Sequence, residues 1–454
     1  MDFHKLSFPE APLIKVTPPG PKSRELLDFQ SAHEGSAVSY PRGLPMGLFR
    51  AKGATVEDVD GNIYIDFFGG AGVMNVGHAN PEILEAVSGQ LGKLTHSLDV
   101  PSPPRKALVE RLCSVLPESL GKIFFGGPTG SDAVESAIKL AKLNSKRPTL
   151  VAFEGGYHGM TSGALSLSSG RSFKEDFLPL CGEVHFVPYA YCYRCVFGKS
   201  PDTCEIQCAR YLDHLLEDPH SGVAKPAAVL IEAIQGEGGS IVPPDTYLPA
   251  VRDICTKHGV LLIIDEIQAG FGRTGKMFSF QHTGVVPDIM TMSKALGGAG
   301  FPVSGIAYRK ELDTWPPGKH IGTFRGNVLA FVAGHAALQF ILDRNLADYA
   351  LQLGDLLLSR LKEIERDSKI VGEARGRGLM LGVEFVKDKA SKKPAPELAG
   401  RIRTDCFQRG LLIEIGGHYS NVARFLPPLV LTQEMALKGI EIFADAVKEA
   451  GKSL

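Results

Sequence analysis

Short apolar runs alternate with helical segments through the middle of this chain, and that alternation restricts the fold more than any other feature. Strand-like apolar runs lie at residues 122–125, 149–153, 227–232 and 260–265. Helical patterns occur between them, for example at residues 131–143 and 248–258. Strands of a buried parallel sheet are apolar throughout because helices cover both faces. The sequence therefore predicts an α/β fold with a mostly parallel sheet between helical layers.

The two ends of the chain follow other patterns. Three segments between residues 48 and 66 alternate as strands do, and Asp60-Gly61 is a hairpin turn signal before the last of them. Residues 1–40 are rich in proline and charge, which predicts an arm or a short helix. Residues 329–366 predict one long helical stretch, and the residues after it predict a separate α/β lobe.

Charge and hydropathy exclude several kinds of partner. The 49 basic and 50 acidic side chains leave a net charge of −1, so no long-range field favours nucleic acid or a membrane surface. The first five residues lack a basic stretch followed by an apolar one, so we expect no secretory signal. Apolar runs such as residues 260–264 are too short to cross a bilayer. A cytoplasmic enzyme is therefore expected.

An acid pair stands at the end of one predicted strand, and a lysine lies on a following loop. The run Leu261-Leu262-Ile263-Ile264 ends in Asp265-Glu266, and Lys294 follows within Thr291-Met292-Ser293-Lys294-Ala295. A carboxylate at a strand tip can hold a protonated heteroaromatic ring nitrogen, and a nearby lysine can form a Schiff base. Taken singly, an acid that caps a turn and a solvated surface lysine are the ordinary explanations.

The residues between this acid and this lysine make the pattern specific. Asp265-Glu266 continues through Gln268 and Ala269-Gly270-Phe271-Gly272-Arg273-Thr274-Gly275 to Pro287-Asp288 and Ser293-Lys294. This stretch closely resembles the signature of the class III, fold-type I aminotransferases, which use pyridoxal 5′-phosphate (PLP). The resemblance extends over nearly the whole chain.

Such a resemblance implies a definite architecture. A large PLP-binding domain over residues 76–330 would hold a mostly parallel seven-stranded sheet flanked by helices. A small α/β domain would combine an N-terminal segment, residues 1–75, with residues 331–454. We therefore expect a fold-type I PLP-dependent transferase.

A glycine-rich turn is the candidate phosphate site. Phe124-Phe125-Gly126-Gly127-Pro128-Thr129-Gly130-Ser131-Asp132-Ala133 runs from a strand into a helix start, where free N–H groups and the helix dipole attract anions. A simple helix cap explains the run equally well on its own. The turn resembles the family's Ser-Gly-Ser-Glu-Ala turn, with Thr129 and Asp132 as mild departures. The resemblance assigns the cofactor phosphate to Gly130 and Ser131.

The resemblance assigns the remaining cofactor contacts residue by residue. Tyr157, in Gly155-Gly156-Tyr157-His158-Gly159, would stack on the pyridine ring. Asp265 would keep the ring nitrogen protonated, and Gln268 would contact the phenolic oxygen. Lys294 would form the Schiff base and, once displaced, would act as the base. His158 and Glu232 complete the expected cofactor contacts.

Two further segments resemble the family's dimer contact and substrate pocket. Ile321-Gly322-Thr323-Phe324-Arg325-Gly326-Asn327 would reach across a homodimer, so that Thr323 touches the phosphate in the partner's site. Glu232 and Glu237 match a loop that lines the substrate pocket, and Arg424 matches the arginine that clamps an α-carboxylate. Glu237 would pair with Arg424 when no α-carboxylate is bound, so that one pocket accepts both an ω-amine and glutamate.

One departure bears on the substrate. Relatives that act on 4-aminobutyrate carry an arginine directly after the Tyr-His-Gly motif, whereas this chain has Met160. The segments 127–130, 159–161 and 323–327 look more like enzymes that transfer an amino group from 2,4-diaminobutyrate to 2-oxoglutarate. We therefore expect an aminotransferase with a small-molecule amino donor, a 2-oxo acid acceptor and ping-pong kinetics.

Two other functions remain compatible with the same residues. Some class III relatives are amino-acid racemases or epimerases, in which the carbanion is reprotonated at Cα on the opposite face. A non-catalytic regulator with this fold is disfavoured by the intact Asp265 and Lys294 and by the lack of a basic patch.

Four of the eight cysteines cluster in the sequence. Cys192-x2-Cys195-x8-Cys204-x3-Cys208 has a spacing that suits zinc, an iron–sulfur cluster or disulfides. Free thiols on a loop away from the chemistry explain the cluster equally well. No metal is expected in the catalytic site itself.

Overall fold

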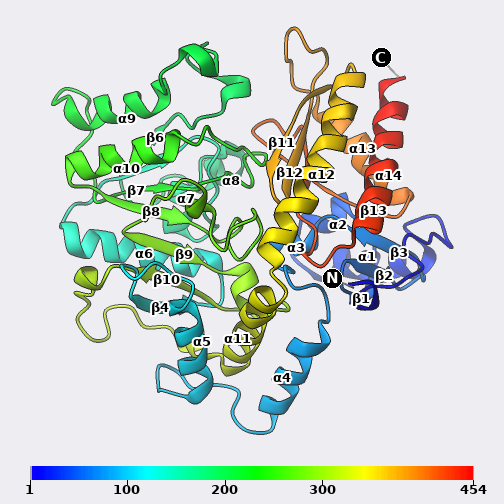
Figure 1. The fold of residues 1–454 in the computed structure, drawn as a ribbon, viewed down its shortest axis with the longest axis horizontal. Helices are drawn as coiled ribbons and strands as arrows, with labels where there is room; N and C mark the ends of the chain where they lie inside the picture. The colour runs from blue at the N-terminus through cyan, green and yellow to red at the C-terminus, as the bar shows by residue number, and fades with distance from the viewer. Residues whose placement is uncertain (1–2, 453–454) are drawn as a thin grey trace.

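The computed structural model describes residues 3–452, and its largest element is a seven-stranded sheet (Figure 1). The strand order is β4 (Lys122–Gly127), β10 (Ser304–Tyr308), β9 (Ile289–Met292), β8 (Leu261–Asp265), β7 (Ala228–Ile231), β5 (Leu150–Phe153) and β6 (Val184–Val187). Neighbouring strands from β9 to β6 are parallel, whereas β10 is antiparallel to both β9 and β4. The predicted α/β fold with a mostly parallel sheet is confirmed.

Successive side chains of the central strand β8 enter two different apolar cores. Leu262 and Ile264 pack in one core, whereas Ile263 packs in the other. Strand side chains alternate between the faces of a sheet, so each face has its own core. Helix α6 (Gly130–Ser145) covers the face of Ile263, and α10 (Tyr247–His258) covers the opposite face. Burial on both faces is the reason that the strand is apolar throughout.

Further helices surround this sheet. They are α4 (Pro81–Leu91), α5 (Pro103–Cys113), α7 (Ser162–Leu167), α8 (Arg171–Lys174), α9 (Gln207–Glu217) and α11 (Val328–Asp343). Helix α4 begins with Pro81 behind the N-cap Asn80, whose side chain accepts a hydrogen bond from the Glu82 N–H. Figure 1 shows α4, α5 and α11 together below the sheet, and α11 packs against both of the others.

The two ends of the chain meet in the second lobe. One sheet has the order β1 (Leu48–Lys52), β2 (Thr55–Asp58), β3 (Ile63–Asp66) and β13 (Leu411–Leu412), and β3 pairs with β13 in parallel. The other has the order β11 (Val371–Arg377), β12 (Met380–Phe385), β15 (Val422–Phe425) and β14 (Glu414–Gly416). The N-terminal strands, blue in Figure 1, therefore lie beside the C-terminal elements. The domain boundaries at residues 75 and 330 stay predictions.

The helices of this lobe come from both chain ends. They are α1 (Pro21–His33), α2 (Tyr40–Gly43), α3 (Gly69–Gly72), α12 (Leu346–Asp367), α13 (Pro396–Gln408) and α14 (Gln433–Gly451). The stretch 329–366 is helical as predicted, but it divides into α11 and α12 at Asn345, whose φ is 47°. Asparagine is one of the few residues that adopt this left-handed conformation readily, and a helix cannot continue through it.

The carboxyl end of β8 and the loops after β7 and β9 face β14 and β15 of the second lobe, and the candidate site lies at this junction. Within residues 3–452, no helix has the length and apolar character needed to cross a bilayer. Met1 and Asp2, two of the residues on which the expected lack of a secretory signal rests, lie outside the described residues, as do residues 453–454.

Candidate active site

One cavity of about 570 Å³ brings together side chains from both lobes. All of the predicted site residues except Thr323 line it: Gly130, Ser131, Tyr157, His158, Glu232, Glu237, Asp265, Gln268, Lys294 and Arg424. Ser39 and Tyr40 from the N-terminal segment and Glu414 from β14 complete its polar wall. No sequence motif had pointed to these three residues.

Asp265 occupies the last position of β8, and its carboxylate is buried. Its Oδ1 accepts hydrogen bonds from Thr291 Oγ1 at 2.9 Å and from the Ile267 N–H at 3.0 Å. Its Oδ2 lies 2.7 Å from Nδ1 of His158. A carboxylate oxygen has two lone pairs, so Oδ2 retains capacity for a second N–H donor from the cavity.

Glu232 lies in the loop after β7 and is buried. It accepts hydrogen bonds from the backbone N–H groups of Tyr157, at 3.0 Å, and of Gly236, at 2.8 Å. Its pKa is raised to about 7, mainly by burial and also by the Asp265 carboxylate, while His158 and the two backbone hydrogen bonds oppose the shift. The Glu232 side chain therefore connects the backbone at Tyr157 to the backbone at Gly236 through these two hydrogen bonds.

Lys294 follows β9 and adopts a left-handed backbone with φ 48°. Its Nζ donates to the Ala71 carbonyl oxygen at 3.1 Å. Burial lowers its pKa to about 8, and the nearby Arg424 guanidinium also lowers it, whereas three cavity carboxylates raise it. A large fraction of this amine is therefore neutral at slightly alkaline pH, the form that can act as a nucleophile or a base.

Gln268 converges on the same carbonyl as Lys294. Its Nε2 donates to the Ala71 oxygen at 3.1 Å, while its Oε1 is buried without any hydrogen-bond partner. Buried polar atoms nearly always have a partner, so an orphan oxygen at a cavity wall indicates a place for a ligand.

The N-terminus of α6 forms the opposite end of the cavity. The Asp132 carboxylate accepts hydrogen bonds from the Thr129 N–H and hydroxyl, which closes the turn that precedes the helix. Ser131 Oγ accepts from the Met160 N–H at 3.1 Å. A Cβ on Gly159, whose φ is 126°, would lie 2.1 Å from that Oγ. Only glycine allows this close approach. Gly130 and Ser131, at the start of the helix, line the cavity and can bind an anion there.

A charged group occupies the side of the cavity formed by the second lobe. Arg424 on β15 is only 2% exposed, and its Nη2 lies 2.7 Å from Glu237 Oε2 and 3.4 Å from Glu414 Oε2. The expected pair of Glu237 and Arg424 is thus present. Nε and Nη1 of Arg424 are buried and have no hydrogen-bond partner. They are free to receive a carboxylate.

Comparisons with known proteins agree with this geometry. A sequence profile of aminotransferase class-III matches residues 38–447. The chain belongs to the class-III aminotransferases.

Individual relatives and a solved structure extend this result. The chain is 42% identical to a diaminobutyrate–2-oxoglutarate aminotransferase of Haemophilus influenzae, over 95% of this chain and 96% of that one. It is 37% identical to an alanine/serine racemase of Pyrococcus horikoshii, over 97% of this chain and 93% of that one. A PLP-bound amine transaminase from an uncultivated Pseudomonas species superposes with a TM-score of 0.84 at 28% identity, over 93% of this chain and 98% of that one.

The cavity fits PLP, the cofactor of this aminotransferase family. The spare lone pair of Asp265 matches a protonated ring nitrogen, and the orphan oxygen of Gln268 matches a polar ring substituent. The anion site at Ser131 matches a phosphate, and Lys294 supplies the amine for the aldehyde.

Thr323 does not line the cavity of its own chain. It lies in a short 3₁₀ turn, Thr323–Gly326, where its carbonyl oxygen lies 2.8 Å from His96 Nε2. The neighbouring Ile321 and Phe324 are 78% and 68% exposed. Its predicted contact with a partner's cofactor therefore stays a prediction.

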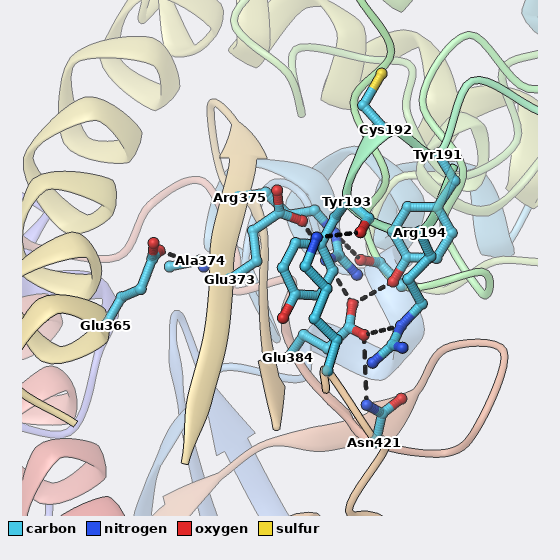
Figure 2. Close-up of polar contacts among 12 residues, drawn as sticks. Tyr191, Cys192, Tyr193, Arg194, Glu365, Glu373, Ala374, Arg375, Glu384 and Asn421 are labelled. Atoms are coloured by element: carbon cyan, nitrogen blue, oxygen red, sulfur yellow. Dashed lines mark hydrogen bonds and ion pairs between the residues drawn. The ribbon is translucent and has the colours of Figure 1, made fainter. Parts of the chain in front are cut away.

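A buried ionic network links the cysteine-containing loop to the second lobe of the aminotransferase. Figure 2 shows the side chain of Glu384, on β12, surrounded by donors. It accepts hydrogen bonds from Tyr191, from Arg194 Nε at 2.5 Å and from Arg375 Nη1 at 2.7 Å. Arg375 Nε also donates to the Gly239 carbonyl oxygen at 2.9 Å. The network therefore anchors the loop that carries Glu237 to β11 and β12.

All eight cysteines have free thiols. Within residues 3–452, the single group of three side chains with potential ligand atoms within 4.8 Å of one another is Asp213, Glu217 and His258. That group is already bridged by Lys257, whose Nζ forms ion pairs with both acids. Cys192, Cys195, Cys204 and Cys208 form neither disulfides nor such a group among the described residues.

Proposed function

We propose that this aminotransferase transfers the 4-amino group of 2,4-diaminobutyrate to 2-oxoglutarate and forms aspartate 4-semialdehyde and glutamate. The observation that carries this proposal is the 42% identity, along 95% of the chain, to the diaminobutyrate–2-oxoglutarate aminotransferase of Haemophilus influenzae. Met160, which is half exposed, lines the cavity where the resemblance places an arginine in enzymes that act on 4-aminobutyrate.

Four groups would hold the cofactor. Gly130 and Ser131 at the start of α6 would bind its phosphate through N–H and hydroxyl donors. Tyr157, fixed through its backbone by Glu232, would stack on the ring. Gln268 would contact the phenolic oxygen from the cavity wall. Held at both ends and on one face, the ring would present one reactive carbon to the substrate.

Two groups would direct the proton transfer. Bound PLP supplies an electron-poor ring that absorbs the electron pair left when a proton leaves the amine-bearing carbon. Asp265, with His158 hydrogen-bonded to Oδ2, would keep the ring nitrogen protonated. Lys294 Nζ would remove the proton from C4 of the substrate and deliver it to the cofactor carbon that receives the amino group. Its lowered pKa, about 8, suits an amine that must give and take a proton.

Glu237 and Arg424 would distinguish the two half-reactions. While the amino donor reacts, Glu237 would stay paired with Nη2 of Arg424, as in the structure. When glutamate or 2-oxoglutarate enters, its α-carboxylate would engage the unpartnered Nη1 and Nε, and Glu237 would move aside. The products of the first half-reaction leave before the acceptor binds, which gives ping-pong kinetics.

A homodimer is part of the proposal. Thr323 would contribute its hydroxyl to the phosphate in the partner's site, and the exposed Ile321 and Phe324 beside it suit an interface. Mixing two inactive variants tests this arrangement. Lys294→Ala lacks the base, and Thr323→Asp places a charge against the partner's phosphate. Mixed subunits that regain activity support a shared site, and mixtures that stay inactive contradict it.

A racemase is the second candidate, because the chain is 37% identical to the alanine/serine racemase of Pyrococcus horikoshii over nearly its full length. Both reactions begin with proton removal from the amine-bearing carbon. A racemase returns a proton to that carbon on the opposite face and needs no keto acid.

A donor panel separates the two candidates. Purified enzyme with PLP is incubated with 2,4-diaminobutyrate, 4-aminobutyrate, ornithine, alanine or serine, each with and without 2-oxoglutarate. We expect glutamate to form fastest with 2,4-diaminobutyrate and only when 2-oxoglutarate is present. Racemisation of alanine or serine without an acceptor, measured by chiral chromatography and exceeding any transamination, would replace the proposal.

A further inference from the structure

Two carboxylates compete for one guanidinium nitrogen at the wall of the cavity. Glu237 lies 2.7 Å from Nη2 of Arg424, and Glu414 lies 3.4 Å from the same nitrogen. Glu414 faces Arg424 directly across the β14–β15 pair, so the register of these strands holds the two side chains together. The three side chains carry two negative charges and one positive charge.

Glu414 is poorly satisfied in this arrangement. Its side chain is only 18% exposed, and its Oε2 has no hydrogen-bond partner. Burial raises its pKa, as does the neighbouring Glu237, whereas Arg424 lowers it. A buried carboxylate with an empty acceptor site is costly unless a cation or a donor reaches it. Arg424, the one cation that the described residues place within ion-pair distance of it, is already paired more closely with Glu237.

When the other charged groups of the cavity take their proposed roles, the part of the cavity left for the substrate has a negative net charge. Asp265 would be neutralised by the ring nitrogen, and Lys294 would act at the reacting carbon. Glu232 is turned toward the N–H groups of Tyr157 and Gly236. Glu237, Glu414 and Arg424 remain, with a net charge of −1. The carboxylate and the 2-ammonium group of 2,4-diaminobutyrate cancel each other, so this donor leaves the charge at −1, whereas 4-aminobutyrate adds an unpaired carboxylate and makes it −2.

We propose that Glu414 determines substrate specificity by binding the 2-ammonium group of the diamino donor while its 4-amino group reacts. This inference rests on the proposed function and adds the residue that would recognise the second amine. One carbon separates C2 from C4 in 2,4-diaminobutyrate, so the two amines lie within one small cavity. Glu414 and Lys294 both line that cavity, and Lys294 lowers the pKa of the Glu414 carboxyl.

The matched substrate for the test is 4-aminobutyrate, which is 2,4-diaminobutyrate without the 2-ammonium group. We expect Glu414→Gln, in the PLP-loaded enzyme, to lower kcat/KM for 2,4-diaminobutyrate by about 10- to 100-fold, the range for a lost charge-assisted hydrogen bond. The value for 4-aminobutyrate should change much less. Glu414→Asp keeps the charge and should restore part of the preference.

The second half-reaction separates specificity from structural support of Arg424. If Glu414 only held Arg424 in place, the KM for 2-oxoglutarate would rise in Glu414→Gln. We expect that KM to stay the same or to fall, because Arg424 loses a competing carboxylate. The control is Glu175→Gln, an acid that lines the adjoining cavity and pairs with Arg171. It should leave both half-reactions unchanged.

The outcomes are distinguishable. A wild-type enzyme that does not use 2,4-diaminobutyrate overturns the proposed function and this inference with it. A wild-type enzyme that uses it, with an unchanged preference over 4-aminobutyrate in Glu414→Gln, overturns the inference alone. Equal losses for both donors and for 2-oxoglutarate would assign Glu414 a structural role and also overturn it. PLP absorbance and thermal unfolding of each variant check that it is folded and loaded.

Discussion

Nδ1 of His158 lies 2.7 Å from Oδ2 of Asp265, and both side chains are buried. An ionised carboxylate only accepts hydrogen bonds, so Nδ1 carries the hydrogen and Asp265 is held in one orientation. The partner of Asp265 in the cavity would then be the ring nitrogen of the cofactor. The two side chains come from different elements, because His158 lies in the loop after β5 and Asp265 is the last residue of β8.

Asp265→Asn should bind PLP but lose most of its activity. The amide cannot keep the ring nitrogen protonated, so the electrons released at the substrate carbon are no longer stabilised. We expect kcat to fall by about 10²- to 10³-fold, the usual loss for one buried electrostatic group. Stopped-flow measurement of each half-reaction should show that both are slowed. Full activity in Asp265→Asn would contradict the proposed role.

Lys294 should make the stability of the apoenzyme depend on pH. Its pKa falls from the ordinary 10.5 to about 8 on folding. Between these values the unfolded chain binds a proton that the folded chain has released, so the free energy of unfolding rises with pH. The difference in stability between wild type and Lys294→Met should therefore change across that window and level off above it. Denaturant titrations of the two apoproteins at several pH values measure this difference, and a constant difference would contradict the prediction.

Glu237→Ala should change the preference between the two amino donors. Without Glu237, Arg424 is open to an α-carboxylate at all times, so glutamate should gain relative to 2,4-diaminobutyrate. We expect the ratio of their kcat/KM values to shift by about 10-fold, the value for one charged hydrogen bond. The ratio is measured by following each half-reaction separately, with Glu175→Ala as the control. An unaltered ratio would contradict the proposal that Glu237 pairs with Arg424 during one half-reaction and moves aside in the other.

Glu384→Gln should destabilise the protein strongly. The carboxylate is completely buried and pairs with both Arg194 and Arg375, which are themselves largely buried. Breaking a buried pair leaves uncompensated charge, at a cost of about 3–5 kcal/mol. Denaturant unfolding measures the loss. Glu373→Gln removes a more exposed acid from the same Arg375 and should cost no more than about 1 kcal/mol. Equal effects of the two substitutions would show that the network does not act as a buried ion pair.

Local sequence was sufficient for the part of the site that belongs to the large sheet. The apolar run before Asp265 predicted β8, the glycine-rich run predicted the turn before α6, and Lys294 was expected on a loop that follows β8. These features depend on contacts within short segments, so hydrophobic pattern and turn chemistry are enough to locate them. The break at Asn345 was missed because a single residue in a left-handed conformation leaves the helical pattern on both sides intact.

Tertiary structure alone decided how the second lobe completes the site. Glu414 carries no motif, and it faces Arg424 only because β14 and β15 pair in that register. The buried network at Glu384 likewise joins side chains separated by about two hundred positions of chain, Tyr191 and Arg194 on one side and Arg375 on the other. Pairings of this kind arise from long-range packing, and no local pattern specifies which acid will meet which base. Sequence determined the fold and the cofactor chemistry expected of this chain, whereas the charge balance around Arg424 emerged only when distant strands came together.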